Sequence, residues 1–173
     1  MKTILAAFVS VVLASAFASA EEVKVPERTP AQKQDRAVNL CTANIAVAIA
    51  YAKSRGATVD DYAAFCGDQY APEWNKEAGF AGFVGGTLGI WESYRRDDEP
   101  PIAILAQSET MIRFKANMGY KRDFKGGTLY GTSAGDFTRW IEVVYGRIAV
   151  YLGCTHTMQP GEGDFVIITI TKK

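Results

Sequence analysis

Residues 132–171 constrain the fold more than any other part of this 173-residue chain. Apolar side chains recur there at three- and four-residue steps, which is the spacing of one face of a helix. Gly153 follows at the position where a helix end favours glycine. A turn-forming stretch, 160–164, then precedes residues 165–171, which are rich in β-branched side chains. The apolar positions of the helical part are Phe137, Trp140, Ile141, Val144, Ile148, Tyr151 and Leu152. The segment therefore predicts one long helix followed by a β-hairpin.

Two further helices are predicted in the N-terminal half. Residues 33–54 place apolar side chains on one helical face. The positions expected to be buried are Val38, Cys41, Ile45, Ala48, Ile49 and Ala52. A second, shorter helix is expected to begin after Thr58, because a threonine hydroxyl can accept hydrogen bonds from the free amides of a helix start. Tyr62, Phe65 and Cys66 follow at helical spacing, so we expect them to pack back on the first helix.

Residues 79–91 combine a glycine face with an aromatic face. Gly79, Gly82, Gly86 and Gly89 are three or four residues apart, so a helix would place them on one side. Each interior glycine costs about 1 kcal/mol relative to alanine, so such a face implies that something lies close against it. Close packing within the protein and a bound ligand both fit the pattern. A structural or partner-binding subunit, including a homo-oligomer, is a further alternative.

Residues 109–117 have the alternation of a β-strand. Ile112, Phe114 and Ala116 fall on one face, whereas Arg113 and Lys115 fall on the other. This is the pattern of an antiparallel strand with one solvated face. Together with the helices, it predicts an α+β fold in which helices pack on a small antiparallel sheet and the chain ends in a helix plus β-hairpin.

Residues 1–20 have the features of a secretory signal peptide: a positive start, an apolar stretch and an A-x-A cleavage site at Ala18 to Ala20. Residues 21–32 contain prolines among charged side chains and are expected to form a flexible leader. Residues 33–173 then form a single α+β domain. No later segment reaches the length of a membrane-spanning helix. We therefore expect a secreted or periplasmic protein without membrane contact after cleavage.

The charge balance argues against nucleic acid as a partner. The chain has 19 Lys and Arg against 19 Asp and Glu, and loss of Lys2 with the signal peptide leaves 18 against 19. Nucleic-acid-binding domains usually carry a basic face. One group of basic residues within 113–125 is interleaved with aromatic residues, but the pattern is more typical of a solvated strand and loop.

Cys154, His156 and Met158 are spaced by two residues, so a strand would align them on one face. Their side chains are soft ligands suited to copper(I), iron or haem. One hypothesis is therefore a metal- or haem-assisted periplasmic enzyme that uses His156 and Cys154. A metal or haem is not the favoured interpretation, because His156 is the single histidine and no C-x-x-C-H motif is present. With three cysteines, Cys41, Cys66 and Cys154, the disulfide pairing stays open.

The favoured hypothesis is an exported protein that binds or senses a hydrophobic or aromatic small molecule. Ligand pockets need an apolar, aromatic wall with a few placed polar groups. The chain supplies 3 tryptophans and 8 tyrosines. The residues expected to line the pocket are Trp91, Glu92, Tyr94, Arg113, Trp140 and Tyr145. The pocket is expected between the sheet, the glycine-rich segment and the last helix.

The end of the chain resembles the end of 4-vinyl-reductase-type small-molecule sensor domains. The resemblance is carried by a helix, Leu152-Gly153, a strand, the turn Gly161-Glu-Gly-Asp164, and Phe165 with the apolar residues after it. It covers the last helix and hairpin alone. Many such domains have a cysteine just after the turn, where this chain has Phe165, Val166 and Ile167. The resemblance implies an α+β fold that binds a small hydrophobic ligand, whereas the departure at the cysteine position argues against carrying over a metal or redox role from the family.

Overall fold

The computed structural model describes residues 27–173 and has the expected α+β fold. The predicted signal peptide, 1–20, and the leader residues 21–26 lie outside the described residues. The elements in chain order are α2 (Pro30–Ser54), α3 (Val59–Tyr70), η1 (Ala71–Glu73), η2 (Lys76–Ala78), α4 (Gly79–Tyr94), β1 (Ala103–Gln107), β2 (Met111–Asn117), η3 (Gly119–Phe124), β3 (Thr128–Leu129), β4 (Thr132–Ser133), α5 (Ala134–Tyr151), β5 (Cys154–Pro160) and β6 (Phe165–Lys172). No helix within 27–173 is both long and apolar enough to cross a bilayer.

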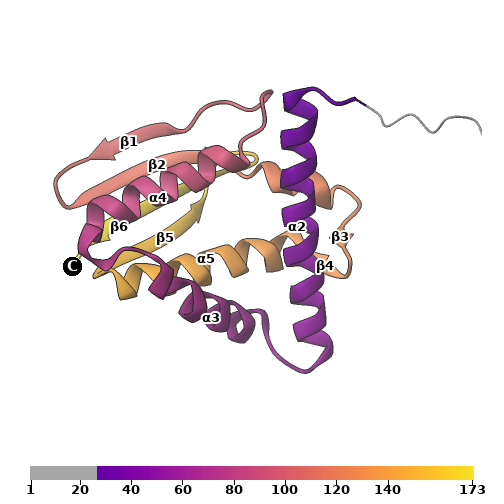
Figure 1. Ribbon diagram of the computed structural model, residues 1–173, viewed down its shortest axis with the longest axis horizontal. Coiled ribbons are helices and arrows are strands. Elements are labelled where there is room, and N and C mark those ends of the chain that lie inside the picture. Colours follow the sequence, from indigo (N-terminus) through magenta and orange to yellow (C-terminus); the bar gives the residue numbers. More distant parts are fainter. Residues whose placement is uncertain (1–26) are drawn as a thin grey trace, which may run out of the picture.

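The main sheet is antiparallel and has the strand order β1-β2-β6-β5. Helices α4 and α5 lie on the same side of this sheet, and α2 crosses near one end of both (Figure 1). The alternation expected in β2 is confirmed, because Phe114 is fully buried and Arg113 is exposed. Phe114 pairs in register with Ile168 of β6, which is also fully buried. The core therefore lies between one face of the sheet and the helices.

The predicted C-terminal helix and hairpin are both present. Helix α5 begins with a capping box: the Ser133 side chain accepts from the Asp136 amide, and the Asp136 carboxylate accepts from the Ser133 amide. Gly153 has a φ of 70° just after the helix, which is the left-handed conformation that glycine adopts readily. Strand β5 continues to Pro160, so Cys154, His156 and Met158 all lie within it.

Helix α2 begins three residues earlier than expected. Thr29 forms a capping box with Gln32, so 30–32 are helical and do not belong to a leader. The buried positions are Val38, Thr42, Ala46 and Ile49. Cys41 is exposed, and the expectation that it lies on the buried face is wrong. Ile45, Ala48 and Ala52, which were also expected to be buried, are half-buried, so the buried row of the helix is shifted toward Thr42 and Ala46.

Helix α3 packs against α5 through small side chains. Thr58 caps it as expected, but Phe65 is 61 % exposed, so its predicted burial is wrong. Ala63, Cys66 and Gly67 are buried instead. A Cβ atom added to Gly67 would lie 2.7 Å from the Cβ of Arg147, so glycine allows the two helices to approach closely.

The glycines of α4 have different environments. A Cβ atom on Gly86 would overlap the indole ring of Trp74, coming within 2.8 Å of its Cη2 atom. Cβ atoms on Gly79, Gly85 and Gly89 would have nothing within 4 Å. Close packing within the protein therefore explains Gly86 but not the whole glycine face.

A buried arginine in the loop after α4 forms polar contacts with α2. Arg96 is 4 % exposed, and its guanidinium donates to Asp35 at 3.3 Å and to Asn39, both on α2. It also donates to Asp123 of η3 at 3.2 Å. These contacts join three segments that are distant in sequence at the end of the helical layer.

Candidate functional site

An apolar cavity of about 460 Å³ lies between helices α4 and α5. Its volume is within the range of small-molecule sites in proteins. Helix α5 contributes Phe137, Trp140, Ile141, Val144, Tyr145 and Ile148. Helix α4 contributes Ile90, Trp91, Ser93 and Tyr94. The remaining wall comes from Ile45 of α2, from Tyr70, Glu73 and Trp74, and from Asn117, Gly119 and Tyr120.

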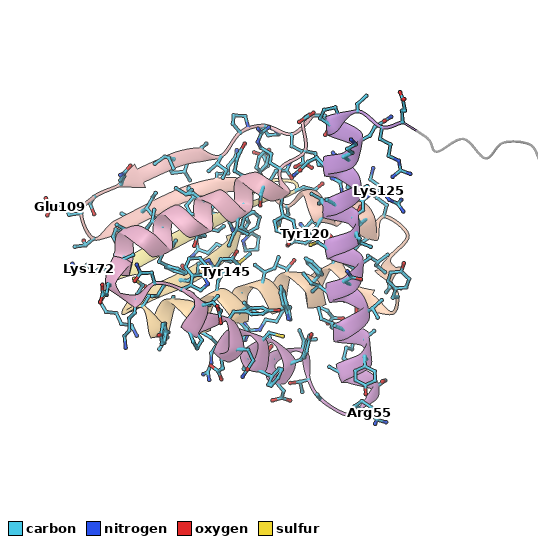
Figure 2. All side chains as sticks on the ribbon, viewed as in Figure 1. Arg55, Glu109, Tyr120, Lys125, Tyr145 and Lys172 are labelled. Atoms are coloured by element: carbon cyan, nitrogen blue, oxygen red, sulfur yellow. The ribbon has the colours of Figure 1, made fainter. Side chains whose placement is uncertain are left out.

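The spacing of the α5 residues explains how one helix supplies so much of the wall. Its six lining residues follow each other at steps of three, one, three, one and three, so they form one continuous stripe. In Figure 2, the labelled Tyr145 and Tyr120 both lie in the region between α4 and α5. Tyr120 packs on Phe137 with ring centroids 4.8 Å apart. The core face predicted for α5 therefore also forms the wall of the cavity.

Four of the six residues expected in a ligand pocket line this cavity: Trp91, Tyr94, Trp140 and Tyr145. The structure does not bring Glu92 or Arg113 to it. Glu92 is exposed, and its Oε1 accepts from Arg95 at 2.8 and 2.6 Å.

Arg113 is exposed on the outer face of the sheet. The alternation in β2 already assigned it to the solvated face, and the sheet separates it from the helices. The prediction that Arg113 lines the pocket is therefore wrong, and the strand alternation that predicted the sheet gives the reason.

Two aromatic wall residues were missed because they come from short segments without a helical or strand period. Trp74 follows η1. Tyr120 lies in η3, directly after β2, and is 5 % exposed. In the sequence, an aromatic side chain close to a proline or a glycine could have indicated them as candidates. That both reach the same cavity depends on tertiary packing.

The polar groups of the wall include four phenols, which belong to Tyr70, Tyr94, Tyr120 and Tyr145. Burial raises the pKa of Tyr94 to about 12, with a further contribution from the Cys41 thiol beside it. Burial also raises the pKa of Tyr145 well above its usual range, and neighbouring Tyr94 adds to the effect. Both phenols are therefore neutral at ordinary pH and able to donate a hydrogen bond. The indole Nε1 of Trp140 is buried and has no acceptor within 27–173.

Charge is nearly absent from the cavity wall. No Lys, Arg or His is among the described residues that line it. Glu73 is the one charged residue among the described residues of the wall, and it is exposed. An isolated charge is costly to bury in such surroundings, so the wall suits an uncharged molecule.

The predicted row of Cys154, His156 and Met158 shares the face of β5 that points toward the helices. Cys154 is fully buried and His156 is 9 % exposed. The imidazole stacks on Tyr145 at 5.3 Å and meets Phe83 edge-on at 6.2 Å. None of the three residues of the row lines the cavity; they lie behind its wall.

The metal site expected at this row stays a prediction. Burial raises the pKa of the Cys154 thiol, which donates to the Leu152 carbonyl at 3.6 Å. A metal ligand would instead be a thiolate. Burial lowers the pKa of His156 to about 4, and both ring nitrogens are enclosed without a partner. The described residues contain no group of three or more His, Cys, Asp or Glu side chains arranged to hold a metal.

In comparisons with protein-family models, curated proteins and solved structures, no family, protein or structure matched this chain. The resemblance to 4-vinyl-reductase-type domains stays a prediction. Its residues form the end of α5, the β5–β6 hairpin and the turn between the strands. At the position after the turn, the Phe165 ring lies 4.1 Å from the Lys115 ammonium on the sheet.

Proposed function

We propose that this chain is an exported protein that binds one neutral, largely apolar small molecule in the cavity between α4 and α5. The observation that carries the proposal is an aromatic-lined space of about 460 Å³ without a buried charged side chain in its wall. Binding a hydrophobic molecule there removes apolar surface from water on both partners, which is favourable by roughly 25 cal/mol per Å². Four wall aromatics, Trp91, Tyr94, Trp140 and Tyr145, supply the flat surfaces that ring-containing ligands pack against.

The contents of the wall favour binding over catalysis. A general base, nucleophile or metal would have to reach the bound molecule. His156 and Cys154, the groups considered for an enzyme, lie outside the cavity wall. The wall itself offers phenols, three indoles, the Ser93 hydroxyl, the Asn117 amide and the exposed Glu73 carboxylate. The export of the protein is proposed on the signal-like sequence of residues 1–20.

The proposal is tested with N-phenylnaphthylamine, a neutral dye whose fluorescence rises in apolar surroundings. We expect the dye to bind saturably at one site per chain. Energy transfer from tryptophan is expected, because Trp91 and Trp140 lie in the wall. Equilibrium titration of the purified protein measures both quantities.

A matched pair of variants on α5 shows where the dye binds. Ile141→Trp adds bulk to the cavity wall and is expected to weaken dye binding at least tenfold. Val150→Trp adds the same ring at a position that is 63 % exposed and is expected to leave binding unchanged. Dye binding that responds equally to both variants, or that is absent from the unmodified protein, would contradict the proposed function.

A further inference from the structure

The tyrosines of the cavity wall differ in how their hydroxyls are satisfied. The Tyr120 hydroxyl lies 2.8 Å from the Thr138 Oγ1, so its hydrogen bond is made within the protein. Tyr145 is 8 % exposed, and its hydroxyl has no hydrogen-bond partner within residues 27–173. This hydroxyl is not among the buried polar atoms that are fully enclosed without a partner. This hydroxyl is therefore partly accessible, on a residue that lines the cavity.

Tyr94 brings a second phenol to the same region from the opposite helix. Tyr145 projects from α5 and Tyr94 from α4, and the two are close enough for Tyr94 to affect the ionisation of Tyr145. Both phenols are held in the neutral form, in which each has one hydrogen to donate. The Cys41 thiol lies beside the Tyr94 hydroxyl and can donate to it, which leaves the Tyr94 hydrogen for another acceptor. The cavity therefore has a polar spot made by two phenols, and Ser93, Asn117 and the exposed Glu73 add further polar groups to its wall.

The Tyr145 ring is held in place from behind. The imidazole of His156 stacks on it at an interplanar angle of 27°. His156 in turn meets the edge of Phe83, which is fully buried. A donor that is already fixed loses less conformational entropy on binding than a mobile one. The arrangement therefore favours recognition of a ligand atom at a fixed place.

The chemistry of this polar spot selects one class of ligand group. A carboxylate would accept from the phenols, but the wall has no cation to balance its charge. An ammonium group would find a carboxylate at the exposed Glu73 alone. A neutral carbonyl or hydroxyl oxygen accepts from a phenol without bringing a charge into the cavity.

We infer that the ligand is a hydrophobic ring compound with a neutral oxygen function, a ketone, aldehyde, ester or alcohol, and that Tyr94 and Tyr145 donate hydrogen bonds to that oxygen. The inference rests on the proposed function, because it names the ligand class of the same cavity. Tyr94 and Tyr145 determine specificity, and the aromatic and aliphatic wall supplies most of the affinity.

The test compares probes of nearly equal shape in competition with N-phenylnaphthylamine. Acetylnaphthalene carries a ketone, isopropenylnaphthalene replaces that oxygen by carbon, and naphthoate carries a negative charge. Tyr145→Phe and Tyr94→Phe are each expected to weaken acetylnaphthalene binding about fivefold, the value of a typical hydrogen bond. Neither variant should weaken isopropenylnaphthalene binding. Naphthoate is expected to bind the unmodified protein more weakly than acetylnaphthalene.

Tyr120→Phe is the matched control, since it removes a phenol hydroxyl from the same wall but one that is bonded to Thr138. It should affect the ketone and the hydrocarbon equally. Equal effects of Tyr145→Phe and Tyr94→Phe on both probes would overturn the inference while leaving the proposed function intact, and so would naphthoate binding more tightly than the ketone. Failure of every probe to bind the unmodified, folded protein would overturn both.

Discussion

The imidazole of His156 stacks on the phenol ring of Tyr145, with ring centroids 5.3 Å apart. His156 lies on β5 of the sheet, and Tyr145 lies on α5 and lines the cavity. His156 is the single histidine of this chain, and its ring supports the cavity wall from outside. This contact links the protonation of a buried sheet residue to the stability of the helical layer.

The first prediction concerns the pH dependence of stability. Burial lowers the pKa of His156 from 6.5 to about 4, so the folded protein keeps the ring neutral while the unfolded chain takes up a proton below pH 6.5. The stability that the folded protein gains by keeping this imidazole neutral is therefore complete above pH 6.5, and it is lost as the pH falls toward 4. Between pH 7.5 and 5 this group should reduce the free energy of unfolding by about 2 kcal/mol. Urea denaturation at a series of pH values measures it.

His156→Leu provides the comparison for this pH series. The imidazole makes no hydrogen bond within residues 27–173, so its loss should cost little at pH 7.5. The variant should lack the decline of stability between pH 7.5 and 5. An identical decline in the variant would show that other groups cause it.

The second prediction concerns the glycines of α4. Gly86→Ala places a methyl group on the Trp74 ring and should lower the free energy of unfolding by about 1–3 kcal/mol through overpacking. Gly89→Ala, in the same helix, meets nothing within 4 Å and should stabilise by about 0.5–1 kcal/mol because alanine favours helix. Thermal and urea unfolding of the two variants distinguish packing from helix propensity. A gain of stability in both would mean that Trp74 does not pack on Gly86.

The third prediction concerns the buried guanidinium of Arg96. Arg96→Met leaves Asp123, Asp35 and Asn39 without their shared donor, and should lower the free energy of unfolding by roughly 3 kcal/mol. Arg139→Met is the control, because Arg139 is half exposed and its pairs with Asp60 and Glu142 are largely in solvent.

Stability of the Arg139 variant should stay close to that of the unmodified protein. Urea denaturation at matched ionic strength compares the two. If both substitutions had the same small effect, the junction around Arg96 would not be important for holding α2 in place.

The fourth prediction concerns thiol reactivity. Cys41 is exposed, whereas Cys66 and Cys154 are buried, and all three are free thiols. Ellman's reagent should therefore label one thiol rapidly in the native protein and all three in denaturant. Cys41→Ser should remove the rapid phase. Persistence of that phase in the variant would indicate that a buried cysteine becomes accessible through local opening.

The sequence predicted the regular elements well because their signals are local. Capping by Thr58 and the stop at Gly153 depend on neighbouring residues, and both are present. The alternation around Phe114 likewise requires no knowledge of the rest of the fold.

Predictions that depended on which side of a helix meets a neighbour were less successful. Cys41 and Phe65 are exposed although they share a helical face with buried residues. Small side chains such as Gly67 mark the real contact between α3 and α5, and hydrophobic spacing gives them no weight. Part of the candidate site was predictable because Trp140 and Tyr145 belong to the strong apolar stripe of α5. The contribution of Trp74 and Tyr120 required the tertiary structure.

The two faces of the sheet have different roles. Its inner face supports the core, and of its strands only β2 reaches the cavity in the described part of the chain, through Asn117. Its outer face presents Thr155 and Thr157 of β5, both exposed, and Arg113 of β2, with Thr169 of β6 between Thr157 and Arg113. Chemical tethering or new charges introduced on that face would leave the cavity wall untouched. The outer face of the sheet is therefore a surface for immobilisation that is separated from the cavity in which we propose that the ligand binds.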